Sequence, residues 1–173
     1  MRIMIFSGKA RHGKDAAAEF ALQVLGRNGK RAVQIAYSDY ISFIATKYFG
    51  WNGERDEAGR TLLQDIGKSF REKDAEFWVR SIADFLRVTD EKFDYALLTG
   101  ARYPNDLSYF VERFDVVTVR VDRPDFDNGL TDEQKAHISE TALDDYPFTH
   151  RISNAGTLED LHVSVIKLLE GLD

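Results

Sequence analysis

The chain of 173 residues is long enough for one domain with a sizeable hydrophobic core. Its formal net charge of -6 argues against duplex nucleic acid as a partner, because proteins that coat nucleic acid are usually basic. The lack of cysteine excludes disulfides and thiolate metal sites, and the four histidines have no zinc-ligand spacing. The apolar start MRIMIFSG is too short for a signal peptide or a membrane span, so we expect a soluble, cytoplasmic protein without membrane contact.

Short apolar segments alternate with amphipathic ones along the chain. The first third predicts a buried strand over 2–7, a polar loop over 8–13, a helix over 14–25, a strand over 31–37 and a helix to residue 48 capped by Ser38 or Asp39. The middle predicts helices over 61–70 and 75–88, a strand over 95–99, a helix over 104–114 and a strand over 116–121.

The last third begins with a segment rich in Asp, Pro and Gly over 123–132, which we interpret as a loop or lid. A very short fifth strand is expected at 152–153, followed by a terminal helix that Thr157 caps. This alternation predicts an α/β domain with a mostly parallel sheet, which binds ligands at the carboxyl ends of its strands.

Residues 8–14 read GKARHGK, the G-x-x-x-x-G-K pattern of a phosphate loop, and lie between a strand and a helix as that motif requires. Gly8 and Gly13 allow tight turns whose backbone N–H groups, with the helix N-terminus, form an anion nest. Lys14 then reaches the β- and γ-phosphates, and Arg11 and His12 lie in the loop beside them. The alternative is a glycine-rich turn with a solvated lysine. The predicted phosphate-binding residues are Gly8, Arg11, His12, Gly13, Lys14, Asp15 and Ala16.

Asp15 stands where a phosphate loop usually has Ser or Thr, whose hydroxyl binds Mg²⁺. A carboxylate is a hard oxygen ligand that can take this place directly or through water, which predicts ATP and Mg²⁺ as cofactors with Asp15 as the metal ligand. The alternative for Asp15 is an acidic residue that only complements the helix dipole.

Five segments together resemble the bacteriophage-type deoxynucleoside monophosphate kinases. They are GKARHGKD at 8–15, GRTLLQDIGKSFREKDAEFW at 59–78, LLTGARYPND at 97–106, HISETALDD at 137–145 and ISNAGTLEDL at 152–161, the last also similar to dephospho-coenzyme A kinases. Two positions depart from the pattern: Gly100 stands where the family usually has Asp, and Ser42 where it often has Lys. Gly100 removes an acid that the family has near the metal, and Ser42 removes a lysine that the family has in contact with the acceptor.

The resemblance implies a three-layer P-loop NTPase fold with about five parallel strands and helices on both faces. It implies one kinase domain over 1–173, with an acceptor-binding helical part at about 38–90 and a lid at about 120–138. The implied activity is ATP-dependent phosphorylation of a deoxynucleoside monophosphate, with small-molecule nucleotides as partners. The alternatives are a kinase of another small acceptor, such as dephospho-coenzyme A, and an inactive ATP-binding regulatory protein. A monomer and a homodimer both remain open.

The remaining candidate residues follow from position and resemblance together. Lys14 and the arginines that flank the end of the fourth strand, Arg120 and Arg123, are the candidates for stabilising the transferring phosphoryl group, or else are solvated charges. The candidates for binding the acceptor are Asp39, Arg60, Gln64, Arg71 and Arg102. The alternative for Asp39 is a helix cap, and for Arg60, Gln64 and Arg71 an exposed helix face. The alternative for Arg102 is a surface ion pair with Asp106. Asn154 and Gly156 are assigned to the adenine pocket by resemblance, against a simple turn.

Two further groups of residues have a purely structural interpretation as well as a functional one. Phe77 and Trp78 either stack on a base or belong to the core, as aromatic residues at helical spacing more often do. His137, Ser139 and Glu140 lie too close in sequence for a nucleophilic triad, so we expect them to form hydrogen bonds between the lid and the core.

Overall fold

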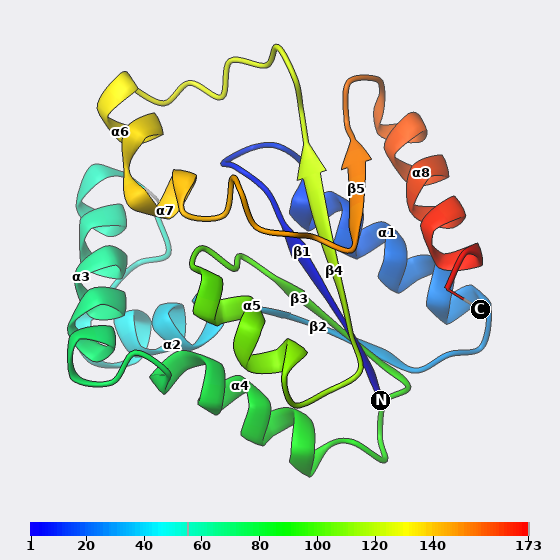
Figure 1. The fold of residues 1–173 in the computed structure, drawn as a ribbon. Coiled ribbons are helices and arrows are strands. Elements are labelled where there is room, and N and C mark those ends of the chain that lie inside the picture. The colour runs from blue at the N-terminus through cyan, green and yellow to red at the C-terminus, as the bar shows by residue number, and fades with distance from the viewer. Residues whose placement is uncertain (55, 173) are drawn as a thin grey trace.

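A five-stranded parallel sheet forms the centre of the computed structural model, which describes residues 1–54 and 56–172 (Figure 1). The strands are β1 (Arg2–Ser7), β2 (Ala32–Ala36), β3 (Tyr95–Thr99), β4 (Val116–Asp122) and β5 (His150–Ser153). Their order is β2-β3-β1-β4-β5, and each neighbouring pair is parallel. The predicted α/β architecture with about five parallel strands is therefore confirmed.

Helices lie on both sides of this sheet (Figure 1). Their bounds are α1 (Lys14–Arg27), α2 (Ser38–Phe49), α3 (Glu57–Lys73), α4 (Phe77–Val88), α5 (Pro104–Val111), α6 (Asp132–Ala136), α7 (Ile138–Thr141) and α8 (Leu158–Glu170). The central strand β1 shows why a layer of helices covers each face of the sheet. Ile3 and Ile5 pack in the core with α4 and α5, whereas Met4 and Phe6 pack in the core with α1 and α8. All four side chains are fully buried, since successive strand residues point to opposite faces.

A smaller cluster joins α2, α3 and α4 through Ala45, Ile66 and Trp78. Trp78 is 2% exposed, and its indole N–H donates to the Gly67 carbonyl at 3.2 Å. Phe77 packs edge-on against Trp78 with ring centroids 4.9 Å apart. Base stacking by Trp78 is therefore ruled out, because its ring is enclosed by the helices of this cluster.

Several elements differ from the sequence predictions, and three of these differences have local reasons. Helix α3 begins at Glu57 rather than 61, because the carboxylate of Asp56 caps it by accepting from the Gly59 N–H at 2.8 Å. Neither Ser38 nor Asp39 caps α2; Tyr37 is its N-cap, and Asp39 lies in the first turn. The short helices α6 and α7 were not predicted, because they have no buried residue and hence no apolar periodicity in the sequence.

Because all strands are parallel, their carboxyl ends meet at one edge of the sheet. The phosphate loop after β1, the segment 100–102 after β3 and residue 123 after β4 are therefore neighbours (Figure 1). Within the described ranges, no helix combines the length and the apolar character needed to cross a membrane.

Candidate functional site

The two glycines of the phosphate loop let it lie tightly against the sheet. A Cβ at Gly8 would be 2.5 Å from the carbonyl oxygen of Val121 in β4. Gly13 has a φ of 94°, and a Cβ there would be 2.5 Å from Nδ2 of Asn154. Any side chain at either position would therefore push the loop away from the strand ends that support it.

Lys14 is placed at the first turn of α1 with its side chain only 10% exposed. Its Nζ lies 3.3 Å from Oδ2 of Asp15, whose side chain is 67% exposed. The amino end of a helix repels a cation, and a nearly buried ammonium group needs an anionic partner. The place therefore suits a bound phosphate, with Asp15 supplying part of the compensating charge.

Asp15 also fits a role beside a phosphate-bound metal ion. Within residues 1–54 and 56–172, no group of three or more acidic or histidine side chains is arranged to hold a metal ion by itself. Mg²⁺ usually keeps several waters and binds through one or two carboxylates plus substrate phosphates. A single exposed carboxylate next to Lys14 matches that pattern.

His12 ties the phosphate loop to the chain that leaves β4 and β5. Its Nδ1 accepts from the Arg123 backbone N–H at 3.0 Å, and its carbonyl accepts from Nδ2 of Asn154 at 3.0 Å. Burial lowers the pKa of His12 below its ordinary value of 6.5; Arg120 and Lys9 lower it further, while Asp122 and Glu140 oppose them. The neutral form of the His12 ring is thus favoured, and its Nδ1 lone pair accepts the hydrogen bond from the Arg123 N–H.

Asn154 and Gly156, the predicted adenine residues, flank the turn before α8. The Asn154 side chain holds the phosphate loop, and its backbone N–H donates to the Asp122 carbonyl at 2.7 Å. Gly156 packs closely on the first turn of α8, because a Cβ there would be 2.5 Å from Oδ2 of Asp160. Both residues therefore have local structural contacts, and contact with adenine stays a prediction.

Two carboxylates from the segment 138–145 clamp the phosphate loop. Glu140 pairs with Nη1 of Arg102 at 2.6 Å and accepts from the Ala10 N–H at 2.9 Å. Asp144 pairs with Nζ of Lys9 at 3.0 Å and with Nη2 of Arg120 at 2.9 Å. Hydrogen bonds of Glu140 were expected between the lid and the core; the structure instead places them between α7, the phosphate loop and Arg102. His137 bonds Ser139 locally, with Nδ1 and Oγ 2.8 Å apart.

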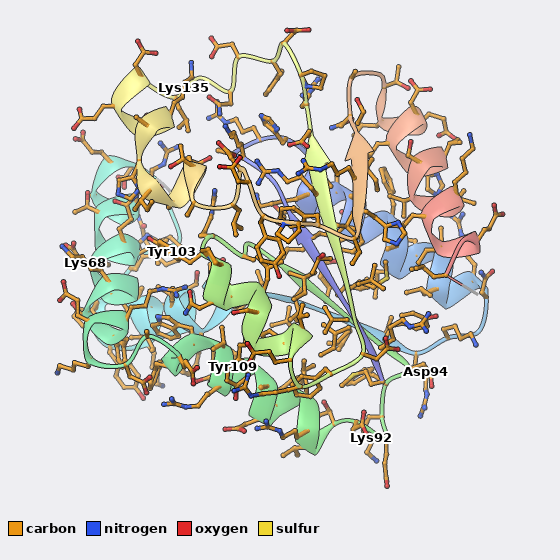
Figure 2. The ribbon with its side chains drawn as sticks, viewed as in Figure 1. Lys68, Lys92, Asp94, Tyr103, Tyr109 and Lys135 are labelled. Atoms are coloured by element: carbon orange, nitrogen blue, oxygen red, sulfur yellow. The ribbon has the colours of Figure 1, made fainter. Side chains whose placement is uncertain are left out.

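Beyond the end of β3, a fully buried carboxylate organises two arginines. Asp106 accepts from Nη1 of Arg71 at 3.0 Å and from the backbone N–H groups of Arg102 at 2.8 Å and Tyr103 at 3.1 Å. The Arg71 guanidinium also lies over the Tyr103 ring, 4.8 Å from its centroid. Tyr103 lies at the start of α5 (Figure 2). The expected alternative for Arg102, an ion pair with Asp106, is wrong, because its guanidinium turns to Glu140.

Among the described residues, no hydrogen bond or ion pair joins Asp39, Arg60 or Gln64 to this acid–arginine group. Arg60 and Gln64 are exposed on α3. The carboxylate of Asp39 accepts from the Ala36 N–H at 2.7 Å. Their contact with an acceptor stays a prediction.

The two candidate lid arginines differ from one another. Arg120 lies inside β4 with its side chain 5% exposed, between Asp122 and Asp144 at 2.9 Å each. It is part of the sheet and no lid residue, so the expectation that it enters the lid is wrong. Arg123 follows β4, and its guanidinium lies 3.8 Å from the Phe126 ring centroid.

A cavity of about 300 Å³ lies between the phosphate loop and the segment 126–140. Its lining residues are Lys9, His12, Phe126, Asn128, Lys135 and Glu140. Lys135 projects from α6 (Figure 2). The Arg11 guanidinium donates to the Asn128 carbonyl at 2.9 Å and so joins the loop to the lid segment. The cavity thus combines two lysines and one carboxylate with the Phe126 ring, beside the loop that precedes Lys14.

Gly100 directly follows β3 with a φ of 86°, and a Cβ there would meet only the Tyr37 nitrogen, at 3.9 Å. The space would admit the Asp that the resemblance leads one to expect, but the left-handed backbone disfavours it. Asp106 and Asp144 were missed as site residues. The available signal was their place inside the segments 97–106 and 137–145, each of which carries the family resemblance.

No family model matches the chain. The uncharacterized protein ORF77 of Ictalurid herpesvirus 1 (strain Auburn) is 31% identical over 156 residues, which are 90% of this chain and 64% of that protein. The chain therefore spans less than two thirds of this relative's length.

Among solved structures, dephospho-CoA kinase from Campylobacter jejuni superposes with a TM-score of 0.57 at 10% identity, over 99% of this chain and 97% of that one. A sugar kinase from Janibacter sp. gives 0.57 at 13% identity, over 98% and 94%. Shikimate kinase from Aquifex aeolicus gives 0.51 at 15% identity, over 99% and 98%. The fold is that of the P-loop kinases. At these identities, the likeness concerns the fold alone.

Proposed function

We propose that the chain transfers the γ-phosphoryl group of ATP to a deoxynucleoside monophosphate and forms the diphosphate. One observation carries the proposal: two separate sets of cations lie at the same edge of the sheet. Lys14 belongs to the phosphate loop, whereas Arg71 and Arg102 are arranged around Asp106 on the other side of Glu140. A monophosphate acceptor needs cations of its own, distinct from those that hold ATP.

The proposed reaction requires positioning more than covalent chemistry. An oxygen of the acceptor phosphate attacks the γ-phosphorus, the bond to the β–γ bridging oxygen breaks, and ADP leaves. Lys14 neutralises charge on the phosphoryl group, while Arg102 and Arg71 orient the attacking phosphate. The bound Mg²⁺ would neutralise phosphate charge, with Asp15 as its protein ligand.

The helices α2 to α4 contribute the acceptor side, in the part at about 38–90, and the segment that follows β4, from residue 123 to about 138, acts as the lid. Arg123 is the lid cation in this proposal, because Arg120 is committed to Asp122 and Asp144. The family resemblance of the segments 59–78 and 97–106 supports a nucleotide acceptor.

A coupled assay of ADP release tests the proposal with dTMP, dGMP, dAMP, dCMP and dephospho-coenzyme A as acceptors. We expect turnover with at least one deoxynucleoside monophosphate. Turnover with dephospho-coenzyme A alone would identify the other kinase, and no turnover with any acceptor would favour an ATP-binding regulatory protein.

The control is Lys14→Ala, which should keep the fold and lose activity by about a hundredfold or more, since it removes a preorganised cation from developing charge. Circular dichroism and the thermal midpoint report whether the variant is folded. Full activity in a folded Lys14→Ala protein would contradict the proposed chemistry.

A further inference from the structure

Glu140 connects the two halves of the candidate site with the two oxygens of one carboxylate. Oε1 pairs with Nη1 of Arg102 at 2.6 Å, and Oε2 accepts from the Ala10 N–H at 2.9 Å. Its side chain is only 10% exposed. Figure 1 shows α7, which carries Glu140, beside the loop that follows β1. Buried hydrogen bonds to an ionised group are the stronger kind, so this bridge holds both partners firmly.

The bridge leaves Arg102 with a free edge. A guanidinium carries five N–H donors in a rigid fork. The recorded hydrogen bonds of Arg102 within the described residues use Nη1 alone, to Glu140 and at 3.4 Å to the Ser139 carbonyl. Nε and Nη2 therefore form an edge that can bind a phosphate through two parallel N–H groups. Glu140 fixes the plane and the direction of that edge.

On the other side, the bridge fixes the third residue of the phosphate loop. Backbone N–H groups in such loops are anion donors, and Glu140 holds the one at Ala10. Its negative charge then lies between the phosphate loop and Arg102. Because like charges repel, this carboxylate disfavours a phosphate that straddles both places, and so keeps the two phosphates on their own sides.

We propose that Glu140 is a positioning residue that sets the distance and orientation between the acceptor-binding Arg102 and the phosphate loop. The proposal rests on the kinase function proposed above and deepens it. Glu140 touches no reacting atom. It acts through Arg102, and its loss should therefore affect the acceptor more than ATP.

The test is Glu140→Gln, which keeps the size of the side chain but has only one oxygen. Arg102 and Ala10 bond different oxygens of Glu140, so in the variant one of these two donors faces the amide N–H₂ instead of an acceptor. We expect the KM for the acceptor to rise roughly ten- to hundredfold, the effect of one lost charge-assisted hydrogen bond. The KM for ATP should stay within about twofold, since Lys14 is untouched.

A matched control comes from the exposed pair Glu112–Arg113, whose carboxylate oxygen and Nη1 are 2.9 Å apart and whose Glu112 side chain is 64% exposed. Glu112→Gln should leave both KM values unchanged. In the double variant Glu140→Gln with Arg102→Lys, the second substitution should add much less than it does alone, because both act on one contact. Independent effects that simply multiply would overturn the proposal.

Two other results would also overturn it. An acceptor KM in Glu140→Gln that matches the Glu112→Gln control would mean that the bridge positions nothing. A lower KM for ATP or for the acceptor would mean that Glu140 occupies a phosphate place that the ligand must clear. Calorimetric binding of pyrophosphate, expected to be equal in wild type and Glu140→Gln, shows that the loop of the variant is intact.

Failure of the kinase function itself would be seen separately, as a wild-type protein without turnover in the acceptor panel. The bridge then has its own readout in amide hydrogen exchange. Glu140→Ala, which removes both oxygens, should speed exchange at Ala10, whereas Glu112→Ala should not. Unchanged exchange at Ala10 would refute the bridge whatever the activity.

Discussion

The buried carboxylate of Asp106 offers the sharpest test of how the proposed acceptor side is built. Its Oδ1 faces Nη1 of Arg71, and its Oδ2 faces the N–H groups of Arg102 and Tyr103. Asp106→Asn replaces one of these oxygens with an N–H₂ group. Whichever way the amide turns, it places donors against the guanidinium or against two backbone N–H groups, and it removes the charge that balances Arg71.

The expected cost follows from burial. Removing one partner of a buried ion pair costs about 3–5 kcal/mol. The Arg71 side chain remains 22% exposed and keeps the Tyr103 ring beside it, so we expect the lower end of that range. A loss of about 3 kcal/mol would lower the thermal midpoint by about 6–12 °C in a protein of this length. The Tyr37 hydroxyl bonds the Asp106 carbonyl, which the substitution leaves in place.

Urea unfolding and thermal denaturation measure this loss, with Asp84→Asn as the control. Asp84 is 70% exposed and pairs with Arg87 at 2.7 Å on the surface of α4. That variant should lose less than about 1 kcal/mol, as exposed pairs do. Steady-state kinetics of Asp106→Asn should show a raised acceptor KM, because Arg71 is no longer oriented. A free energy of unfolding equal to that of Asp84→Asn would refute the role assigned to this carboxylate.

The other predictions concern the metal, the acceptor and pH. Asp15→Ala should raise the Mg²⁺ requirement more than the ATP requirement, and Asp15→Ser should partly restore it; an unchanged Mg²⁺ titration leaves only the helix-dipole role. Arg102→Lys and Arg71→Ala should each lower acceptor efficiency by about ten- to hundredfold and spare ATP affinity. If ATP affinity falls instead, this division of the site is wrong. His12 has a lowered pKa in the folded state, so its contribution to stability is full above 6.5 and is lost as the pH falls through the folded-state value. His12→Asn keeps a hydrogen-bond acceptor but does not titrate. The free energies of unfolding of wild type and this variant should therefore diverge as the pH falls, and parallel pH profiles would contradict the role assigned to His12.

The sequence by itself determined the parts of this protein that depend on short-range patterns. The phosphate loop could be recognised because GKARHGK lies between an apolar strand and an amphipathic helix, all within the first 27 residues. The terminal helix followed from Thr157, whose hydroxyl accepts from the Asp160 N–H as a helix cap. Strand positions followed from runs such as Ile3 to Phe6, which parallel sheets bury on both faces.

Tertiary structure alone decided which acid meets which cation. Arg71 and Asp106 are 35 residues apart in the chain, Arg102 and Glu140 are 38 apart, and Ala10 and Glu140 are 130 apart. Such pairs depend on the strand order β2-β3-β1-β4-β5, which brings distant loops to one edge. The strand pattern over 116–121 correctly included Arg120, whereas the lid boundary at about 120 that the resemblance implied is wrong, because two acidic partners hold Arg120 inside β4. Local sequence preferences cannot predict these long-range pairs, because a charged side chain has the same local preferences whichever partner the fold brings to it.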